Sequence, residues 1–318
     1  MRLLGAMFGA GVALRNALYD HGVLRARQLQ APVVSVGNLS VGGAGKTPFV
    51  LLLGELLKAR GIEFDVLTRG YGRASRGVAV VDPAGSAAEF GDEPLLLARR
   101  LGVPVIVGEK RYAAGILAEQ KFGPRLHLLD DGFQHRQLAR DFDIVLLMPD
   151  DVQDHLLPEG RLRESLSALR RAHAVVLTCV PGIPDDLPDG LLLEGTPLWR
   201  VRRGIRAEGV PPTVVAFCGI ARPQLFFGQL RSAGIALVAE AGFRDHHAYK
   251  ECDVAELLSR KRQSGAAGFV TTEKDAINLG PLAAELQPLA VVRVAMELAD
   301  AQAVIDHILT KTGPHRTS

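Results

Sequence analysis

The sequence predicts an α/β protein with two domains in series, each built on a largely parallel sheet with helices packed against it. Two observations lead to this fold class. Short apolar runs alternate with helical segments along the chain, and a single proline-rich stretch interrupts the alternation. Short apolar strands separated by helices are typical of right-handed βαβ units, whose strands are parallel. The length of 318 residues agrees, because at roughly 150 residues per domain such a chain is expected to hold two.

The first domain is expected to begin with a strand over residues 33–36, a glycine-rich turn and a helix over residues 47–60. Gly61 is expected to end that helix, because glycine adopts the left-handed conformation after a helix at little cost. The further apolar runs that predict strands of this domain are residues 64–67, 104–107, 126–129, 143–147 and 174–178. Together they predict a parallel sheet with helices on both faces.

A proline-rich stretch, residues 181–212, marks the expected boundary between the domains. Its prolines are Pro181, Pro184, Pro188, Pro197, Pro211 and Pro212. A second series of strands is expected at residues 213–218, 235–239, 268–272 and 290–294. The predicted division is an N-terminal segment over 1–30 packed onto the first domain, the first domain over 31–196, a linker over 197–212 and a smaller α/β domain over 213–318.

The composition is that of a soluble globular protein, with 47% hydrophobic and 23% charged residues. Aromatic residues make up 5%, which disfavours stacking platforms for single-stranded nucleic acid, and the net charge of +2 argues against a nucleic-acid binder. Cys179, Cys218 and Cys252 lie far apart. We therefore expect neither a cysteine zinc site nor a disulfide framework, and the simplest interpretation is a reducing compartment.

Positive charge is concentrated at the N-terminus. Residues 1–30 hold four arginines against one aspartate, and an uncharged run of 12 residues from Leu3 to Leu14 lies between Arg2 and Arg15. About 20 apolar residues are needed to span a bilayer, so this run is too short to cross one. Two interpretations remain open: a helix packed on the first domain, or an amphipathic helix that lies in a membrane interface.

The sharpest chemical feature is the segment GNLSVGGAGKTP, residues 37–48, between the first strand and the first helix. Its Gly45-Lys46-Thr47 matches the end of the phosphate-binding pattern G-x-x-x-x-G-K-[ST], although Ser40 replaces the first glycine. Such a P-loop points backbone N–H groups at phosphate, and the helix N-terminus adds partial positive charge. Lys46 is expected to neutralise phosphate oxygens and Thr47 to ligate Mg²⁺. The predicted phosphate contacts are Ser40, Gly42, Gly43, Ala44, Gly45, Lys46 and Thr47.

Two adjacent carboxylates, Asp130 and Asp131, follow the strand expected at residues 126–129. In P-loop folds, an acidic residue at the end of a strand beside the phosphate loop holds Mg²⁺. We expect Asp130 to be this ligand together with Thr47, with Asp131 as the alternative. Because Asp-Asp-Gly is also good turn chemistry, an ordinary polar turn stays open as well.

Eight motifs, in order along the chain, carry a resemblance to a known family. They are GNLSVGGAGKTP, TRGYGR (68–73), GDEP (91–94), DDGFQH (130–135), LPEGRLRE (157–164), AFCGIARP (216–223), FRDHH (243–247) and TTEKD (271–275). Together they resemble the tetraacyldisaccharide 4′-kinase family over about residues 15 to 295.

The resemblance implies an activity and a place for it. The family uses ATP and Mg²⁺ to phosphorylate the 4′-hydroxyl of an acylated disaccharide 1-phosphate lipid, which gives lipid IVA in lipid A biosynthesis. The resemblance further implies a P-loop kinase domain, joined by a two-stranded linker to a smaller α/β domain. It also implies a monotopic enzyme on the cytoplasmic face of the bacterial inner membrane.

The resemblance implies roles for individual residues. Asp92 takes the place of a catalytic carboxylate and His246 that of its histidine partner, with His247 as the alternative. Without the resemblance, the residues favour a helix N-cap for Asp92, because it precedes Glu93-Pro94 and an apolar run. Lys46 is placed with the catalytic residues. The residues matched to positions near the nucleotide phosphates are Arg111, Asp131, Gln134 and Arg163.

A function of a different class also stays open: a P-loop ATPase or GTPase switch that acts on a protein partner. A guanine site usually has an N/T-K-x-D stretch, whereas Lys274 and Asp275 are adjacent here, so a GTPase is disfavoured. A switch ATPase would also not need the FRDHH loop. The partners expected are thus the lipid substrate and the membrane surface, without nucleic acid; the sequence sets no oligomeric state.

Overall fold

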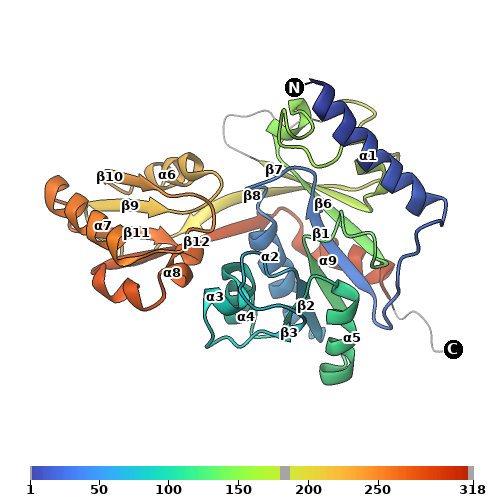
Figure 1. Ribbon diagram of the computed structural model, residues 1–318, viewed down its shortest axis with the longest axis horizontal. Helices are drawn as coiled ribbons and strands as arrows, with labels where there is room; N and C mark the ends of the chain where they lie inside the picture. Colours follow the sequence, from blue (N-terminus) through green and yellow to red (C-terminus); the bar gives the residue numbers. More distant parts are fainter. Residues whose placement is uncertain (1, 180–186, 314–318) are drawn as a thin grey trace.

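One mixed sheet of 12 strands runs through the described part of the chain, in the order β10-β9-β11-β12-β8-β7-β6-β1-β5-β2-β4-β3. The structure is a computed structural model that describes residues 2–179 and 187–313, so Pro181 and Pro184 lie outside the described residues. Figure 1 shows two lobes on this sheet: a larger one around β1 and a smaller one around β9. The predicted class, α/β with a largely parallel sheet, is confirmed.

The larger lobe contains every strand that its apolar runs predict. They are β1 (Val33–Asn38), β2 (Phe64–Thr68), β4 (Val105–Val107), β5 (Leu126–Asp130), β6 (Phe142–Leu147) and β7 (Ala174–Cys179), all parallel to their neighbours among them. The short strand β3 (Ala79–Val80) closes the edge in antiparallel pairing with β4. The six parallel strands are buried almost throughout, as a sheet covered on both faces requires.

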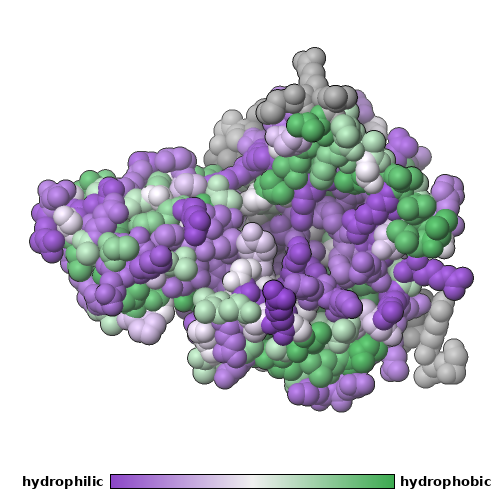
Figure 2. All heavy atoms as spheres, viewed as in Figure 1, coloured by the Kyte–Doolittle hydropathy of each residue, from purple (hydrophilic) through white to green (hydrophobic). Residues whose placement is uncertain are grey.

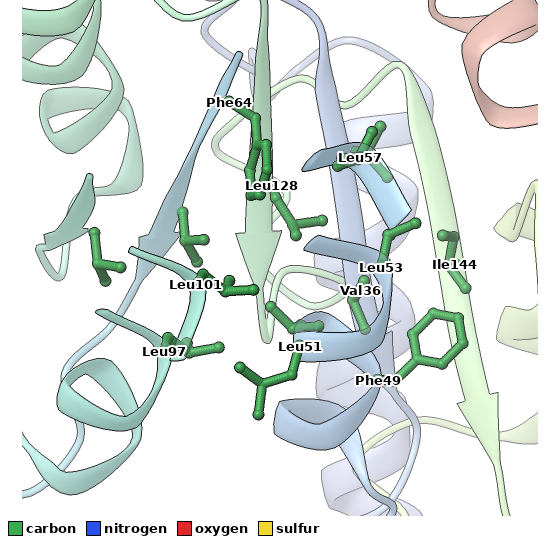
Figure 3. Packing of buried hydrophobic residues seen from close by; sticks show 14 of the residues in the cluster. Val36, Phe49, Leu51, Leu53, Leu57, Phe64, Leu97, Leu101, Leu128 and Ile144 are labelled. Carbon is green, nitrogen blue, oxygen red and sulfur yellow. The ribbon is translucent and has the colours of Figure 1, made fainter. Parts of the chain in front are cut away.

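Helices on the two faces of this sheet build separate cores. On one face lie α2 (Lys46–Ala59), α3 (Ala87–Phe90), α4 (Asp92–Leu101) and α9 (Ala301–Lys311). On the other face lie α5 (Arg111–Phe122) and the short 3₁₀ helices η1 (Pro149–Gln153) and η2 (Leu166–Arg171). Figure 3 shows leucines of α2 and α4 packed against Val36, Leu128 and Ile144. Gly61 ends α2 with a φ of 66°, as expected.

The smaller lobe repeats the pattern. Its strands β9 (Val214–Cys218), β10 (Leu237–Gly242) and β11 (Gly268–Thr272) are parallel and alternate with α6 (Pro223–Ser232), α7 (Glu251–Ser264), α8 (Glu273–Leu279) and the 3₁₀ helix η3 (Gly280–Glu285). Phe217 and Phe269 fill the core on one face, and Phe226 and Phe227 fill the core on the other.

Two strands connect the lobes. β8 (Leu198–Arg206) extends the larger sheet beside β7, and β12 (Leu289–Leu298) begins parallel to β11 and then pairs antiparallel with β8. The chain then returns to the larger lobe, where Ile305 and Ile308 of α9 enter the core formed with α2. Residues 301–311, which the sequence placed in the smaller domain over 213–318, thus pack with the larger lobe.

The N-terminal helix α1 (Arg2–Asp20) lies across the larger lobe, far from the smaller one (Figure 1). It is anchored by polar contacts: Asn16 Nδ2 donates to Glu164 at 2.6 Å, and Arg15 donates to the carbonyl of Gln134 at 3.0 Å. Leu4, Met7 and Leu14 are nevertheless each more than half exposed. In Figure 2, hydrophobic residues gather on the side of the lobe that carries this helix. No helix in the described ranges is long and apolar enough to cross a membrane.

Candidate active site

The phosphate loop leaves the end of β1 and turns into α2. Gly42, Gly43 and Gly45 have φ values of 77°, 70° and 83°, a region that glycine adopts without strain. A Cβ atom on Gly45 would lie 2.4 Å from Cε of Met296, and one on Gly43 would lie 3.1 Å from Cδ of Arg222. The loop therefore needs glycine for its backbone conformation, and β12 and the β9–α6 loop approach it closely.

The side chain of Lys46, at the end of the phosphate loop, contacts oxygen atoms of its own lobe. Its Nζ donates to Oδ1 of Asn38 at 2.9 Å and lies 3.5 Å from Oδ1 of Asp131. Arg163 donates to the same carboxylate at 3.0 Å and to the carbonyl of Asn38 at 3.1 Å. Burial would raise the pKa of Asp131, but the Lys46 and Arg163 cations hold it well below its usual range. Two cations that suit phosphate therefore converge on one ionised carboxylate.

Asp130, the last residue of β5, lines the same cavity and is only 2% exposed. The hydroxyl of Thr68 donates to its Oδ2 at 3.0 Å. Burial, together with the negative charges of Glu93 and Asp131, raises the pKa of Asp130 to about 7. A carboxylate that is destabilised by burial and like charges is one that a bound cation would stabilise.

The oxygen atoms around Asp130 fit a magnesium ion that is shared with phosphate. Thr47, Thr68 and Asp130 line the same cavity, and all three offer hard oxygen donors. Within residues 2–179 and 187–313, no group of three or more His, Cys, Asp or Glu could hold a metal alone. Mg²⁺ in phosphate-transfer sites usually takes one or two carboxylates and completes its shell with phosphate and water. The donor set therefore suits Mg²⁺ bound together with a nucleotide.

Asp92 is the first residue of α4 and not its N-cap; its carboxylate accepts a bond from the N–H of Glu93 at 2.7 Å and also faces the smaller lobe. The N-cap of α4 is Gly91, and the carboxylate of Asp92 contacts Nδ1 of His246 at 2.9 and 3.0 Å. Burial would raise the pKa of Asp92, but the hydrogen bond from His246 and the charge of Lys274 lower it to about 2. Burial would likewise lower the pKa of His246, yet the bond to Asp92 raises it. The two residues therefore form a carboxylate–imidazole pair across the lobes.

The neighbouring histidine has a different partner. Nε2 of His247 lies 2.9 Å from Oδ2 of Asp253, within its own lobe. His246 reaches Asp92 because its backbone has a φ of 56° and its N–H donates to the carbonyl of Gly219 at 3.1 Å. Of the two histidines in FRDHH, the structure places His246 beside Asp92.

A cavity of about 460 Å³ lies between the lobes and collects most of the predicted residues. Those that line it are Ser40, Gly42, Gly43, Ala44, Gly45, Lys46, Thr47, Asp130, Asp131, Arg163 and His246. Three predicted residues do not line it: Asp92, which precedes the lining residue Glu93 and contacts His246, and the pair Gln134 and Arg111. Gln134 donates to the carbonyl of Asn38 at 3.0 Å, and Arg111 is buried with a bond to the carbonyl of Glu109 at 3.0 Å.

Other residues of the site escaped sequence reasoning. Glu93, Arg203 and Lys274 line the cavity, and Asn278 contacts Asp92. Glu93 and Lys274 lie in the motifs GDEP and TTEKD. These motifs contributed to the family resemblance, but the sequence assigned no role to either residue. Arg203 belongs to a run of arginines in the linker, and nothing in its sequence surroundings marks it out.

The fold and the site together define a class: a P-loop protein with the parallel sheet, phosphate loop and acidic strand end of the nucleotide-dependent kinases. The family described as "Tetraacyldisaccharide-1-P 4'-kinase" matches residues 1–313. A tetraacyldisaccharide 4'-kinase of Koribacter versatilis is 53% identical over 324 residues, covering 97% of this chain and 98% of the relative. One of Geobacter metallireducens is 40% identical over 337 residues, covering 97% of each.

A solved structure agrees with these relatives. The crystal structure of LpxK from Aquifex aeolicus in complex with ATP superposes with a TM-score of 0.80 at 34% identity, covering 97% of each chain. The chain belongs to the tetraacyldisaccharide-1-P 4'-kinase family. The resemblance seen in its motifs is thereby confirmed, and a protein-partnered ATPase switch is not favoured.

Proposed function

We propose that this protein transfers the γ-phosphate of ATP to the 4′-hydroxyl of tetraacyldisaccharide 1-phosphate, the step that gives lipid IVA in lipid A biosynthesis. The observation that carries the proposal is the Asp92–His246 pair, whose His246 lines the same cavity as the phosphate loop. Phosphoryl transfer needs a held phosphate, charge neutralisation and a group that receives the proton of the attacking hydroxyl. This cavity offers residues for each of these tasks.

The loop over residues 40–47 and the side chain of Lys46 bind the β- and γ-phosphates in this proposal. Lys46 and Arg163 now share the carboxylate of Asp131. Phosphate oxygens would compete for the same two cations, so nucleotide binding draws them toward the cavity. Thr47 and Asp130 are the residues that would hold Mg²⁺, and the bound ion would neutralise charge on the transferring phosphoryl group.

Asp92 accepts the hydrogen bond, and then the proton, of the attacking 4′-hydroxyl. With a pKa of about 2, it is ionised across the physiological range and ready to accept. A base of such low pKa acts mainly by orienting the hydroxyl toward the phosphate, since geometry comes before pKa in this kind of catalysis. His246 fixes the carboxylate through Nδ1 and can pass the proton onward.

The nucleoside of ATP is proposed to lie at the apolar end of the cavity, where Ile220, Phe226, Val292 and Val294 form the lining. Arg203 of β8 lines the same end, and its Nε has no hydrogen-bond partner among the described residues. Burial and the charge of Arg222 lower the pKa of Arg203 to about 10. A half-buried guanidinium with no acidic partner among the described residues suits stacking on a purine ring and attraction to phosphate.

Helix α1 is proposed to bring the enzyme to the cytoplasmic face of the inner membrane as a peripheral, monotopic protein. Its exposed Leu4, Met7, Phe8 and Leu14 supply an apolar surface, while Arg15 and Asn16 tie the helix to the larger lobe. An apolar face combined with basic residues is what an interfacial helix requires. The position suits an acylated substrate, which stays in the bilayer while its sugar is phosphorylated.

We retain the division into an N-terminal segment, a P-loop domain over 31–196, a β linker over 197–212 and a smaller domain from 213. The packing of α9 with α2 supports adding residues 301–311 to the P-loop domain.

The test is transfer of labelled phosphate from [γ-³²P]ATP to tetraacyldisaccharide 1-phosphate in detergent micelles. The wild-type protein should label the lipid, and Asp92→Asn should lower kcat by at least 100-fold with little change in KM for ATP. A protein that hydrolyses ATP but never labels the lipid would contradict the kinase assignment. An unchanged kcat for Asp92→Asn would contradict only the role given to Asp92.

A further inference from the structure

Every long-range partner of the Asp92 carboxylate comes from the smaller lobe. His246 contacts it from the loop after β10, and Nδ2 of Asn278 donates to its Oδ2 at 2.9 Å from α8. Nζ of Lys274, also on α8, lies 4.0 Å from the same oxygen. Asp92 is 4% exposed, so these groups replace nearly all of its water. In its own lobe, it accepts a bond from the neighbouring N–H of Glu93 at 2.7 Å.

Lys274 joins the two acidic residues at the start of α4. Its Nζ donates to Oε1 of Glu93 at 3.1 Å while facing Asp92. Burial would lower the pKa of Lys274, but Glu93 and Asp92 hold it above its usual range. Burial and the charge of Asp92 would raise the pKa of Glu93, but the charges of Lys274, His246 and Lys46 together lower it. Lys274 therefore favours the ionised form of two adjacent carboxylates, the buried Asp92 and the partly exposed Glu93.

A separate ion pair, Arg100–Glu273, also joins α4 to α8. Nη1 of Arg100 donates to both carboxylate oxygens of Glu273, at 2.9 and 3.0 Å, and Nη2 of Arg100 reaches Glu55 at 3.1 Å. This pair joins the same two helices without touching Asp92. It offers a way to weaken the lobe contact while the partners of Asp92 stay in place.

Taken with the roles proposed above, the geometry points to Asn278 and Lys274 as positioning residues for the phosphoryl-transfer step. We propose that α8 delivers them when the lobes meet, and that they set the orientation and ionisation of Asp92. The inference rests on the proposed function of Asp92. It adds that the Asp92 carboxylate has all of these partners only when the lobes are closed. A single hinge motion would move His246, Asn278 and Lys274 away from it together.

The test compares three variants of the full-length protein: Asn278→Ala, Asn278→Asp and Lys274→Met. We expect Asn278→Ala to lower kcat about 10-fold, the scale of a lost hydrogen bond to a charged group, with KM for ATP within about 2-fold. Asn278→Asp has the same shape but carries an acceptor and a negative charge, so its loss should be larger. Lys274→Met should lower kcat by 10- to 100-fold.

The pH profile separates positioning from a merely structural role. The groups that face Asp92 are Glu93 on its own helix, Lys274 and Asn278 on α8, and His246 with the adjacent Asp245 in the loop after β10. Removing a positive charge or adding a negative one raises the pKa of both members of the Asp92–His246 pair. The acid limb of kcat should therefore move to higher pH by about one unit in Lys274→Met and Asn278→Asp, and by less in Asn278→Ala, which removes only a hydrogen bond that lowers the pKa of Asp92.

Arg100→Met is the matched control, because it weakens the α4–α8 contact and leaves Asn278 and Lys274 intact. Its acid limb should coincide with that of the wild-type protein. The inference is overturned if Arg100→Met reproduces the shift, or if the α8 variants keep wild-type kcat and profile while Asp92→Asn is inactive. If Asp92→Asn itself keeps full kcat, the proposed role of Asp92 fails instead, and the two failures are distinguished. Circular dichroism and the KM for ATP report whether each variant folds.

Discussion

Replacing Asp130 with asparagine should stabilise the ligand-free protein at neutral pH and abolish its activity. The wild-type carboxylate is 2% exposed and lies beside Glu93 and Asp131, and its pKa is raised from 3.8 to about 7. Asparagine has nearly the same shape, keeps an oxygen that can accept the bond from Thr68, and carries no charge to be repelled. The same change removes the carboxylate that would bind Mg²⁺.

The size and sign of the change in the free energy of unfolding follow from proton linkage at Asp130. Below pH 3.8, the carboxyl group is neutral in both the folded and the unfolded chain. Between pH 3.8 and about 7, the folded protein keeps a proton that the unfolded chain has released, so the free energy of unfolding falls as pH rises. At about 1.4 kcal/mol per unit, the difference reaches about 4 kcal/mol above pH 7. Asp130→Asn should therefore gain little at pH 4 and up to about 4 kcal/mol at pH 8.

The assay is urea unfolding followed by circular dichroism in EDTA without nucleotide, at pH 5 and pH 8, using the first transition of each curve. Asp131→Asn is the opposite control, because the lowered pKa of Asp131 means that its ionised form stabilises the fold above its unfolded pKa. That variant should lose stability at pH 8. If Asp130→Asn gains no more at pH 8 than at pH 5, the carboxylate is not destabilised in the ligand-free site and the reasoning is refuted.

Three further predictions concern the nucleotide, the base pocket and the membrane. Lys46→Ala should lower kcat by at least 100-fold, the loss typical of a charge-stabilising donor, with the fold retained in circular dichroism; near-normal kcat would contradict its role at the phosphates. Arg203→Ala should raise KM for ATP about 10-fold and leave KM for the lipid unchanged; an unchanged KM for ATP would place the purine elsewhere. The double change Met7→Asp and Leu14→Asp should lower partitioning into anionic vesicles by about 100-fold or more, because each apolar side chain contributes about 1.5–3 kcal/mol when buried. Undiminished sedimentation with vesicles would show that α1 is not the anchor.

The strands that local sequence predicts are those whose pattern is strong by itself. Runs such as residues 33–36 and 143–147 are apolar except for Ser35 and Asp143, because a parallel strand is covered on both faces, and each forms a strand. β8 was harder to foresee, since exposed arginines alternate with half-buried residues along it. Its place in the sheet depends on pairing with β12, about ninety residues further on, and no local pattern records such a pairing.

The same distinction holds for the site. The phosphate loop is contiguous, so its residues and their chemistry can be inferred from spacing alone. The Asp92–His246 contact joins positions 154 residues apart, and a family resemblance was needed to expect it. The contact of Asn278 with Asp92 spans 186 residues, and asparagine on a helix surface gives no signal of its own. Contacts made across the two lobes exist only once both have folded.

The two strands that connect the lobes, β8 and β12, lie side by side, so the smaller lobe is inserted into the chain of the larger lobe. The chain leaves the larger lobe at the end of β8 and re-enters it along β12, and Arg206 lies opposite Arg293 in the antiparallel pair. The segment between them therefore starts and finishes at one point in space. A two-residue turn could replace it and close the ribbon as a hairpin, leaving the P-loop lobe continuous from α1 to α9. The smaller lobe is thus a cassette that could be exchanged between relatives at a single junction.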